Sequence, residues 1–102
     1  MRSSIVLAAL CVASTLATRG VDYSTPVSQT TILCFKSNGI SFAIPRAWKS
    51  YGAFDENALN NVLAARNGGM PYVDIYMFPC RGQSATTQVN DLISRMGNSN
   101  YG

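Results

Sequence analysis

The sequence predicts an α/β fold in which helices cover a parallel sheet. Three segments with the composition of buried strands alternate with three segments whose apolar residues recur at helical spacing. Alternation of this kind is typical of β-α-β units, whose strands run parallel. The 102 residues are enough for one small domain. A complete α/β barrel needs about 250 residues and is excluded.

Residues 1–17 have the composition of a cleaved secretory signal peptide. Arg2 supplies a positive charge, residues 5–13 are apolar, and small residues precede a cleavage site after Ala17. The apolar run is shorter than the roughly 20 residues that a membrane-spanning helix needs, although a membrane anchor is the alternative interpretation. We therefore expect residues 18–102 to form one domain that is secreted or enters a digestive compartment, without a membrane span.

The first strand, helix and second strand are expected between residues 20 and 45. Residues 20–24 are β-prone, and Ser28 is a suitable N-cap for a helix that runs to about Ser37. Residues 40–44 are apolar without strict alternation, as in a strand covered on both faces. Pro45 cannot donate to a strand ladder, so it indicates a bulge or the end of this strand. The apolar side of the helix consists of Ile32, Leu33 and Phe35.

The second helix is expected after a loop over residues 48–54. Asp55 is a good N-cap, and Glu56 suits the positive first turn of a helix, so both carboxylates are assigned structural roles. Gly68 and Gly69 end the helical pattern. The apolar residues at helical spacing are Ala58, Leu59, Val62, Leu63 and Ala65.

The third strand and third helix complete the alternation. The strand is expected over residues 72–78 and is followed by a loop over residues 79–83. Ser84 is a suitable N-cap for the helix, which ends before Gly97. The apolar side of this helix consists of Ala85, Val89, Leu92, Ile93 and Met96.

Charged and aromatic side chains cluster at the ends of the predicted strands, where parallel α/β folds bind their ligands. Asp22 lies near the end of the first strand, and Arg46 and Trp48 follow the second. Asp74 and Tyr76 lie in the third strand. Such a combination would suit a carbohydrate, because aromatic rings stack on sugar faces and charged groups bind sugar hydroxyls. The alternative is structural: an ion pair between Arg46 and Asp22 or Asp74, with Tyr76 and Trp48 as packing aromatics.

The composition excludes several kinds of functional site. The chain has no His, which removes Ser-His-Asp triads and His-based metal sites, and its three Cys cannot form a Cys₄ cage. We therefore expect no metal and no cofactor. The formal net charge of +3 loses one positive charge with Arg2, and no Lys/Arg cluster is present, so nucleic acid is not an expected partner.

The cysteines are consistent with secretion. Cys11 leaves with the signal peptide, and Cys34 and Cys80 remain as an even pair for which a disulfide is the default expectation. A bridge needs Cα atoms within about 7 Å, whereas the predicted topology separates these two positions. Either the first helix is short and tilted, or each thiol belongs with a cysteine outside this sequence.

Three motifs in order resemble the nematode and protist lysozymes, which belong to or lie close to glycoside hydrolase family 25. They are Gly-Val-Asp-Tyr-Ser at residues 20–24, Ser-Phe-Ala-Ile-Pro-Arg-Ala-Trp at residues 41–48, and Tyr-Val-Asp-Ile-Tyr-Met-Phe-Pro-Cys at residues 72–80. Asp-Glu-Asn-Ala at residues 55–58 and Gly-Gly-Met at residues 68–70 also fit the second helix of these proteins. The resemblance covers nearly all of residues 18–102.

The resemblance implies an irregular, TIM-like β/α barrel that cleaves the β-1,4 bond between N-acetylmuramic acid and N-acetylglucosamine in peptidoglycan. Asp22 matches a carboxylate of the family's active site, and Tyr76 matches an aromatic residue that contacts substrate. The family's principal catalytic element is an Asp-x-Glu in the fourth strand, which these residues do not contain. The expectation is therefore about three β/α units of the barrel, ending before its general acid.

Three hypotheses about function follow. The first is a secreted lysozyme-like protein of antibacterial defence or bacterial digestion, weakly active or inactive without the catalytic Glu. The second is a non-catalytic binder of cell-wall glycans, and the third is a fragment of a truncated gene. An open parallel sheet would also expose an edge through which the chain could self-associate.

Overall fold

The structure is a computed structural model that describes residues 17–102. Residues 1–16, nearly all of the expected signal peptide, lie outside the described residues, so that expectation stays a prediction. Within the described range, no helix has the length and apolar character needed to cross a membrane. The elements in chain order are β1 (Arg19–Tyr23), α2 (Gln29–Ser37), β2 (Ile40–Lys49), β3 (Ala53–Phe54), α3 (Ala58–Asn67), β4 (Tyr72–Val73), β5 (Tyr76–Met77) and α4 (Ala85–Met96).

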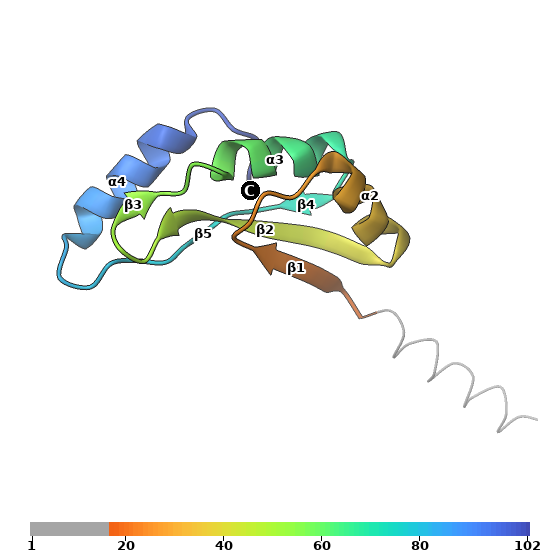
Figure 1. The fold of residues 1–102 in the computed structure, drawn as a ribbon, viewed down its shortest axis with the longest axis horizontal. Coiled ribbons are helices and arrows are strands. Elements are labelled where there is room, and N and C mark those ends of the chain that lie inside the picture. Colours follow the sequence, from red (N-terminus) through yellow and green to blue (C-terminus); the bar gives the residue numbers. More distant parts are fainter. Residues whose placement is uncertain (1–16) are drawn as a thin grey trace, which may run out of the picture.

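Every other strand of residues 17–102 pairs with β2. Strand β1 lies along one side of β2 in parallel, and β4 and β5 also pair with β2 in parallel. Strand β3 returns from β2 as an antiparallel hairpin, with Trp48 opposite Phe54. The sheet is therefore mixed, and the prediction of a parallel sheet is wrong at β3 (Figure 1). These elements form an open sheet, so the barrel implied by the resemblance stays a prediction.

Strand β2 is twice as long as expected, because Pro45 does not end it. Pro45 lies opposite Tyr23, the last residue of β1, and the pairing with β5 begins at Arg46. The proline thus lies between two ladders, where its missing N–H is tolerated. The register shifts between Arg46 and Trp48, which places the consecutive residues Ala47 and Trp48 in the core.

The predicted third strand is divided into two short strands. Asp74 and Ile75 separate β4 from β5, and the Asp74 carboxylate accepts a hydrogen bond from the Ile75 N–H at 2.8 Å. An Asp that bonds the backbone next to it competes with regular pairing, which explains the interruption. The expected loop over residues 48–54 is also wrong, since β2 continues to Lys49 and β3 follows a tight turn at Gly52.

The first and third predicted helices are confirmed with their caps. Ser28 Oγ accepts the Thr31 N–H at 3.2 Å at the start of α2, and Ser84 Oγ accepts the Thr87 N–H at 3.2 Å at the start of α4. The second helix begins later than predicted, with Asn57 rather than Asp55 at the N-cap position of α3.

The three helices lie on one side of the sheet (Figure 1). Each helix buries fewer of its apolar residues than predicted, because it packs against the sheet on one side only. Leu33, Leu63 and Ile93 are at least half exposed, and Leu59 and Val89 are also exposed. The core between the two layers consists of Ile32, Ala43, Ala47, Trp48, Ala58, Val62, Ala65, Met70, Val73, Leu92 and Met96.

A buried amide joins α4 to the sheet. Gln88 is 3% exposed, and its Oε1 accepts both the Trp48 indole N–H at 2.9 Å and the Cys80 N–H at 2.8 Å. Its Nε2 donates to the carbonyls of Cys80 and Gln83 at 3.1 and 3.3 Å. The full hydrogen-bonding capacity of this amide is therefore used, and it fixes the loop between β5 and α4.

We predict that Gln88→Ala destabilises the fold by about 2–3 kcal/mol, because it leaves buried donors of Trp48 and Cys80 without an acceptor. Urea unfolding monitored by tryptophan fluorescence measures this change. The matched control is Gln29→Ala, which removes an exposed amide and is expected to cost no more than about 0.5 kcal/mol. Equal unfolding midpoints for the two variants would contradict the role of Gln88.

Candidate functional site

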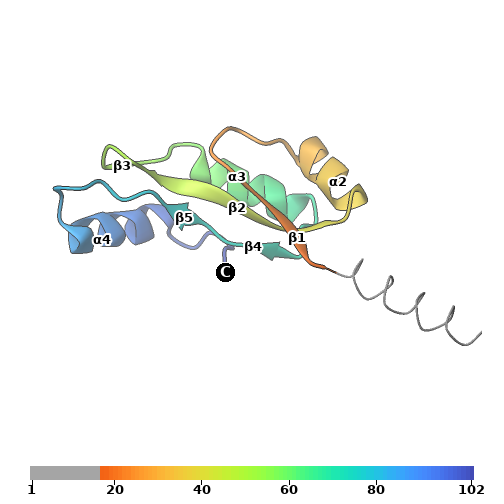
Figure 2. The ribbon, with the colours of Figure 1, turned by 90° about the horizontal axis from the view of Figure 1, so that it is seen from below.

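The face of the sheet turned away from the helices carries the candidate site. Successive side chains of a strand point to opposite faces. Ala43 and Ala47 of β2 belong to the core on the helix side, whereas Ile44 and Arg46 are only half-buried. Phe42 shares the face of Ile44, and its ring fills the space where a side chain at Gly20 of β1 would lie. We call this surface the open face; Figure 2 views the sheet from that side.

Asp22 and Tyr76 line one cavity on the open face. It has a volume of about 410 Å³ and is bounded by Asp22, Ile44, Tyr76 and Phe78. Asp22 lies beside Ile44 in the β1–β2 register, and its carboxylate is exposed. Phe78 is 56% exposed, so the cavity, called the Asp22 pocket below, combines a free carboxylate with aromatic surface.

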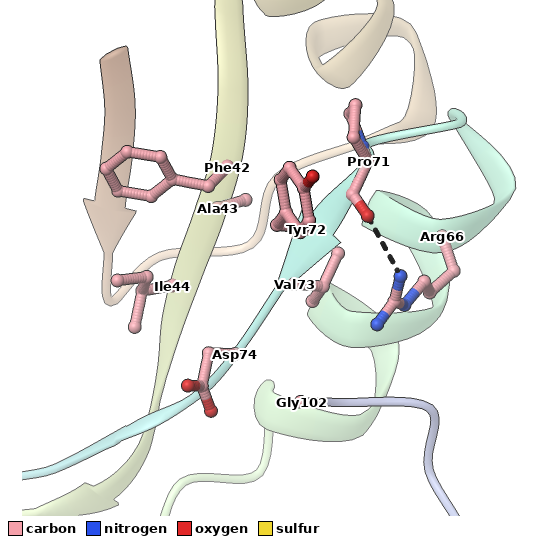
Figure 3. A pocket seen from close by; sticks show the side chains of 9 residues that line it. All are labelled: Phe42, Ala43, Ile44, Arg66, Pro71, Tyr72, Val73, Asp74 and Gly102. Atoms are coloured by element: carbon pink, nitrogen blue, oxygen red, sulfur yellow. Dashed lines mark hydrogen bonds between the residues drawn. The ribbon is translucent and has the colours of Figure 1, made fainter. Parts of the chain in front are cut away.

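Asp74 lies in a second, neighbouring cavity of about 370 Å³ (Figure 3). Ile44 lines both cavities, so the two carboxylates occupy adjacent pockets rather than one. Arg66 donates to the Asn100 carbonyl at 2.7 Å, and the Gly102 N–H donates to the Val73 carbonyl at 2.7 Å. The remaining lining residues are Phe42, Ala43, Pro71 and Tyr72.

Arg46 forms an ion pair with Asp55, which corrects the prediction of Asp22 or Asp74 as its partner. Its Nε donates to Asp55 Oδ2 at 2.8 Å, and the Asp55 side chain is 1% exposed. The second oxygen of Asp55 accepts the Asn57 N–H at 3.0 Å, so Asp55 supports the start of α3 without being its N-cap. The Asp55 carboxylate raises the pKa of Arg46, and the nearby Tyr76 adds to this effect.

Trp48 is not part of the open face, contrary to its prediction as a substrate-binding residue. Its ring is 3% exposed, and its N–H is occupied by Gln88. The register shift in β2 turns it toward the helices. Ile44 and Phe78, by contrast, are site residues that the sequence analysis did not single out. Each lies two residues from a predicted site residue, so the strand period of two could have identified them.

The predicted disulfide between Cys34 and Cys80 is not formed in the structure. Both thiols are free: Cys34 is exposed on α2, and Cys80 follows β5. Helix α2 and the segment that leads from β5 to α4 lie toward opposite ends of the fold (Figure 1), so the even number of cysteines was a misleading guide.

Two further groups have shifted pKa values. Lys49 donates to Glu56 at 2.6 Å; this contact raises the pKa of Lys49 and lowers the pKa of Glu56. Burial raises the pKa of Tyr23, which packs against the core. Among the described residues, no group of three or more Cys, Asp or Glu side chains is placed to hold a metal ion.

Comparison with known proteins identifies relatives of this chain. The family model described as "Lysozyme-like protein 1" matches residues 13–102. The chain is 45% identical over 89 residues to probable GH family 25 lysozyme 2 of Dictyostelium discoideum, and 36% identical over 88 residues to lysozyme-like protein 5 of Caenorhabditis elegans. These alignments cover 81% and 86% of this chain, respectively, and 41% of each relative. The chain thus spans about two fifths of the length of these two proteins.

We predict that Asp55→Ala lowers the free energy of unfolding by about 2–3 kcal/mol, because it removes the partner of Arg46 and the acceptor for Asn57. Chemical unfolding followed by circular dichroism provides the measurement. Asp91→Ala is the matched control, since its pair with Arg95 is exposed and contributes about 0.5 kcal/mol or less. If Asp55→Ala loses as little stability as Asp91→Ala, the buried ion pair does not stabilise the fold as predicted.

Proposed function

The chain belongs to the lysozyme-like protein 1 family, and on that premise we propose that its open face binds the glycan chains of bacterial peptidoglycan and forms part of a glycoside hydrolase site. Family membership confirms the resemblance to lysozymes and supports a glycoside hydrolase role. The observation that carries the proposal is the shared cavity of Asp22 and Tyr76, two residues that the resemblance assigns to the site.

The Asp22 pocket has the chemistry that a sugar ring requires. The exposed carboxylate of Asp22 accepts hydrogen bonds from sugar hydroxyls, and the rings of Tyr76 and Phe78 offer apolar surface to a sugar face. Glycoside hydrolysis generally uses two carboxyl groups placed on either side of the scissile bond. We assign Asp22 to one of these two groups.

The second carboxyl group decides whether these residues hydrolyse the glycan by themselves. Asp74 lies in the neighbouring pocket, and the 102 residues contain no Asp-x-Glu. Without a general acid, the rate is expected to fall by about 10²–10⁴-fold. We therefore propose weak hydrolysis by this chain alone, with the acid supplied from outside these residues in a fully active site.

A non-catalytic binder of cell-wall glycans is the second candidate function. Asp22 and Asp74 lie in two separate pockets, and this separation favours a binder. Hydrolysis generally needs two carboxyl groups on either side of the same glycosidic bond, and neither pocket contains such a pair. In either case, we propose that the protein is secreted and acts on bacteria in defence or digestion, in keeping with the composition of residues 1–17.

Tyr76→Ala is predicted to reduce retention of the chain on insoluble peptidoglycan by about tenfold, through the loss of ring contact with the sugar. Asp22→Ala is expected to weaken binding in the same direction. Co-sedimentation with purified walls measures both effects. The matched control is Tyr51→Ala, which removes a ring that is 67% exposed and does not line the Asp22 pocket. Failure of the wild-type chain to sediment with walls would refute binding by the open face.

Release of reducing sugar from Gram-positive walls distinguishes the two candidate functions. Slow release that is abolished by Asp22→Asn, with the wall still bound, supports a hydrolase. Wall binding without any release supports the non-catalytic binder. Release at the rate of a full-length relative would contradict the proposal that an acid outside these residues is needed.

A further inference from the structure

We propose that the cavity lined by Asp74 binds an ammonium group of the peptide stem that peptidoglycan carries on its muramic acid. This cavity of about 370 Å³ is called the Asp74 pocket below. The inference rests on the proposed function, because the stem reaches the Asp74 pocket only when the glycan occupies the Asp22 pocket. It gives the second cavity of the open face a ligand group of its own, a primary amine on an aliphatic chain.

Four side chains of the Asp74 pocket lie on the open face of two paired strands. Phe42 of β2 is opposite Tyr72 of β4 in the parallel register. The Asp74 N–H donates to a β2 carbonyl at 3.1 Å, which continues this ladder and brings Asp74 beside Ile44. Val73 belongs to the core on the helix side, so the residues before and after it, Tyr72 and Asp74, point to the open face.

The Asp74 carboxylate has no cationic partner among residues 17–102. The ion pairs of this range are formed by Arg46, Lys49 and Arg95, each with another carboxylate. Asp74 is exposed, and its Oδ1 accepts the Ile75 N–H at 2.8 Å, whereas its Oδ2 accepts no hydrogen bond from this part of the chain. One oxygen therefore fixes the orientation of the carboxylate, and the other is left for a ligand.

Arg66 lines the same pocket but does not pair with Asp74. Its Nε donates to the Asn100 carbonyl at 2.7 Å, and its Nη1 donates to the Pro71 carbonyl at 3.5 Å. Figure 3 shows the Arg66 guanidinium directed toward Pro71, whereas the Asp74 side chain is directed away from Arg66. The arginine thus holds backbone carbonyls at one end of the pocket and leaves the carboxylate at the other end unpaired.

These features match an ammonium group on an aliphatic chain. A carboxylate attracts a cation and accepts charge-assisted hydrogen bonds from its N–H groups. The rings of Phe42 and Tyr72 offer apolar surface to the methylene groups, and the faces of such rings also attract cations. Tyr72 is 69% exposed, so a ligand can reach its ring. An anionic group would instead be repelled by Asp74.

The third residue of the peptidoglycan stem, a lysine or a diaminopimelate, supplies such an amine. Ile44 lines both pockets, so they are neighbours on the open face. Three extended residues span about 10 Å, which allows a stem attached to a sugar in the Asp22 pocket to enter the Asp74 pocket. The lactyl carboxyl group of that sugar forms the amide bond to the stem, so it carries no charge that Asp22 would repel.

The test compares three soluble glycans by calorimetric titration of the full 102-residue chain. The first is a tetrasaccharide of N-acetylglucosamine and N-acetylmuramic acid whose stems are L-alanyl-D-isoglutaminyl-L-lysine. The second is the same compound with its lysine ε-amines acetylated, and the third has methylamide groups in place of the stems. The variant is Asp74→Asn, which removes the charge but keeps the Oδ1 acceptor for the Ile75 N–H. Asp91→Asn is the matched control, because Asp91 lines neither pocket.

We expect the wild type to bind the amine-bearing glycan about tenfold more tightly than the acetylated one, and Asp74→Asn to lose this preference. The glycan without stems should bind the wild type and Asp74→Asn with the same affinity. Tyr72→Ala should weaken binding of the amine-bearing glycan by about threefold. Asp91→Asn should behave as the wild type with all three glycans.

Equal affinity of the wild type for the amine-bearing and acetylated glycans overturns the role of Asp74, while glycan binding by the open face stands. A preference that persists in Asp74→Asn also overturns it, because the size of the acetyl group and not the charge is then the cause. An equal loss for all three glycans in Asp74→Asn indicates a structural effect and has the same consequence. If the wild type binds none of the three glycans, the proposed function fails together with this inference.

Discussion

Strand β2 is the constraint on which the rest of the structure depends. All four other strands of residues 17–102 pair with it. Its side chains alternate between the face that the helices cover and the open face. Ala43 and Ala47 pack against the helices, while Ile44 and Arg46 lie on the open face. A register slip of one residue would exchange these two sets, so the core and the candidate site are specified by the same ladder.

Two polar anchors connect this strand to elements far along the chain. Asp55 holds Arg46 at the end of the β2–β3 hairpin, and Gln88 holds Trp48 beneath α4. Both anchors are buried and both use more than one hydrogen bond, which makes each costly to disrupt. They differ in consequence: the Gln88 anchor stabilises the helix layer, whereas the Asp55 anchor orients a cation at the open face. Both anchors therefore contribute to stability, and the Asp55 anchor also fixes the orientation of Arg46.

The sequence predicted those features that depend on neighbouring residues. The helices that begin after Ser28 and Ser84 were predictable because a serine cap and helical spacing are local signals. The proximity of Asp22 and Tyr76 followed from the motifs and the rule for strand ends. The partner of Arg46, the burial of Trp48 and the free state of Cys34 depend on how distant segments pack, which spacing does not encode. The interruption at Asp74 depends on one side-chain hydrogen bond.

We propose that the glycan binds the open face around β2 and not the helix layer. The most direct measurement is the change in backbone amide NMR shifts when a soluble peptidoglycan fragment is added to the chain. We expect the largest changes at Asp22, Ile44 and Tyr76, with α2 unaffected. Changes confined to the helices, with the amides of β1, β2 and β5 unmoved, would contradict it.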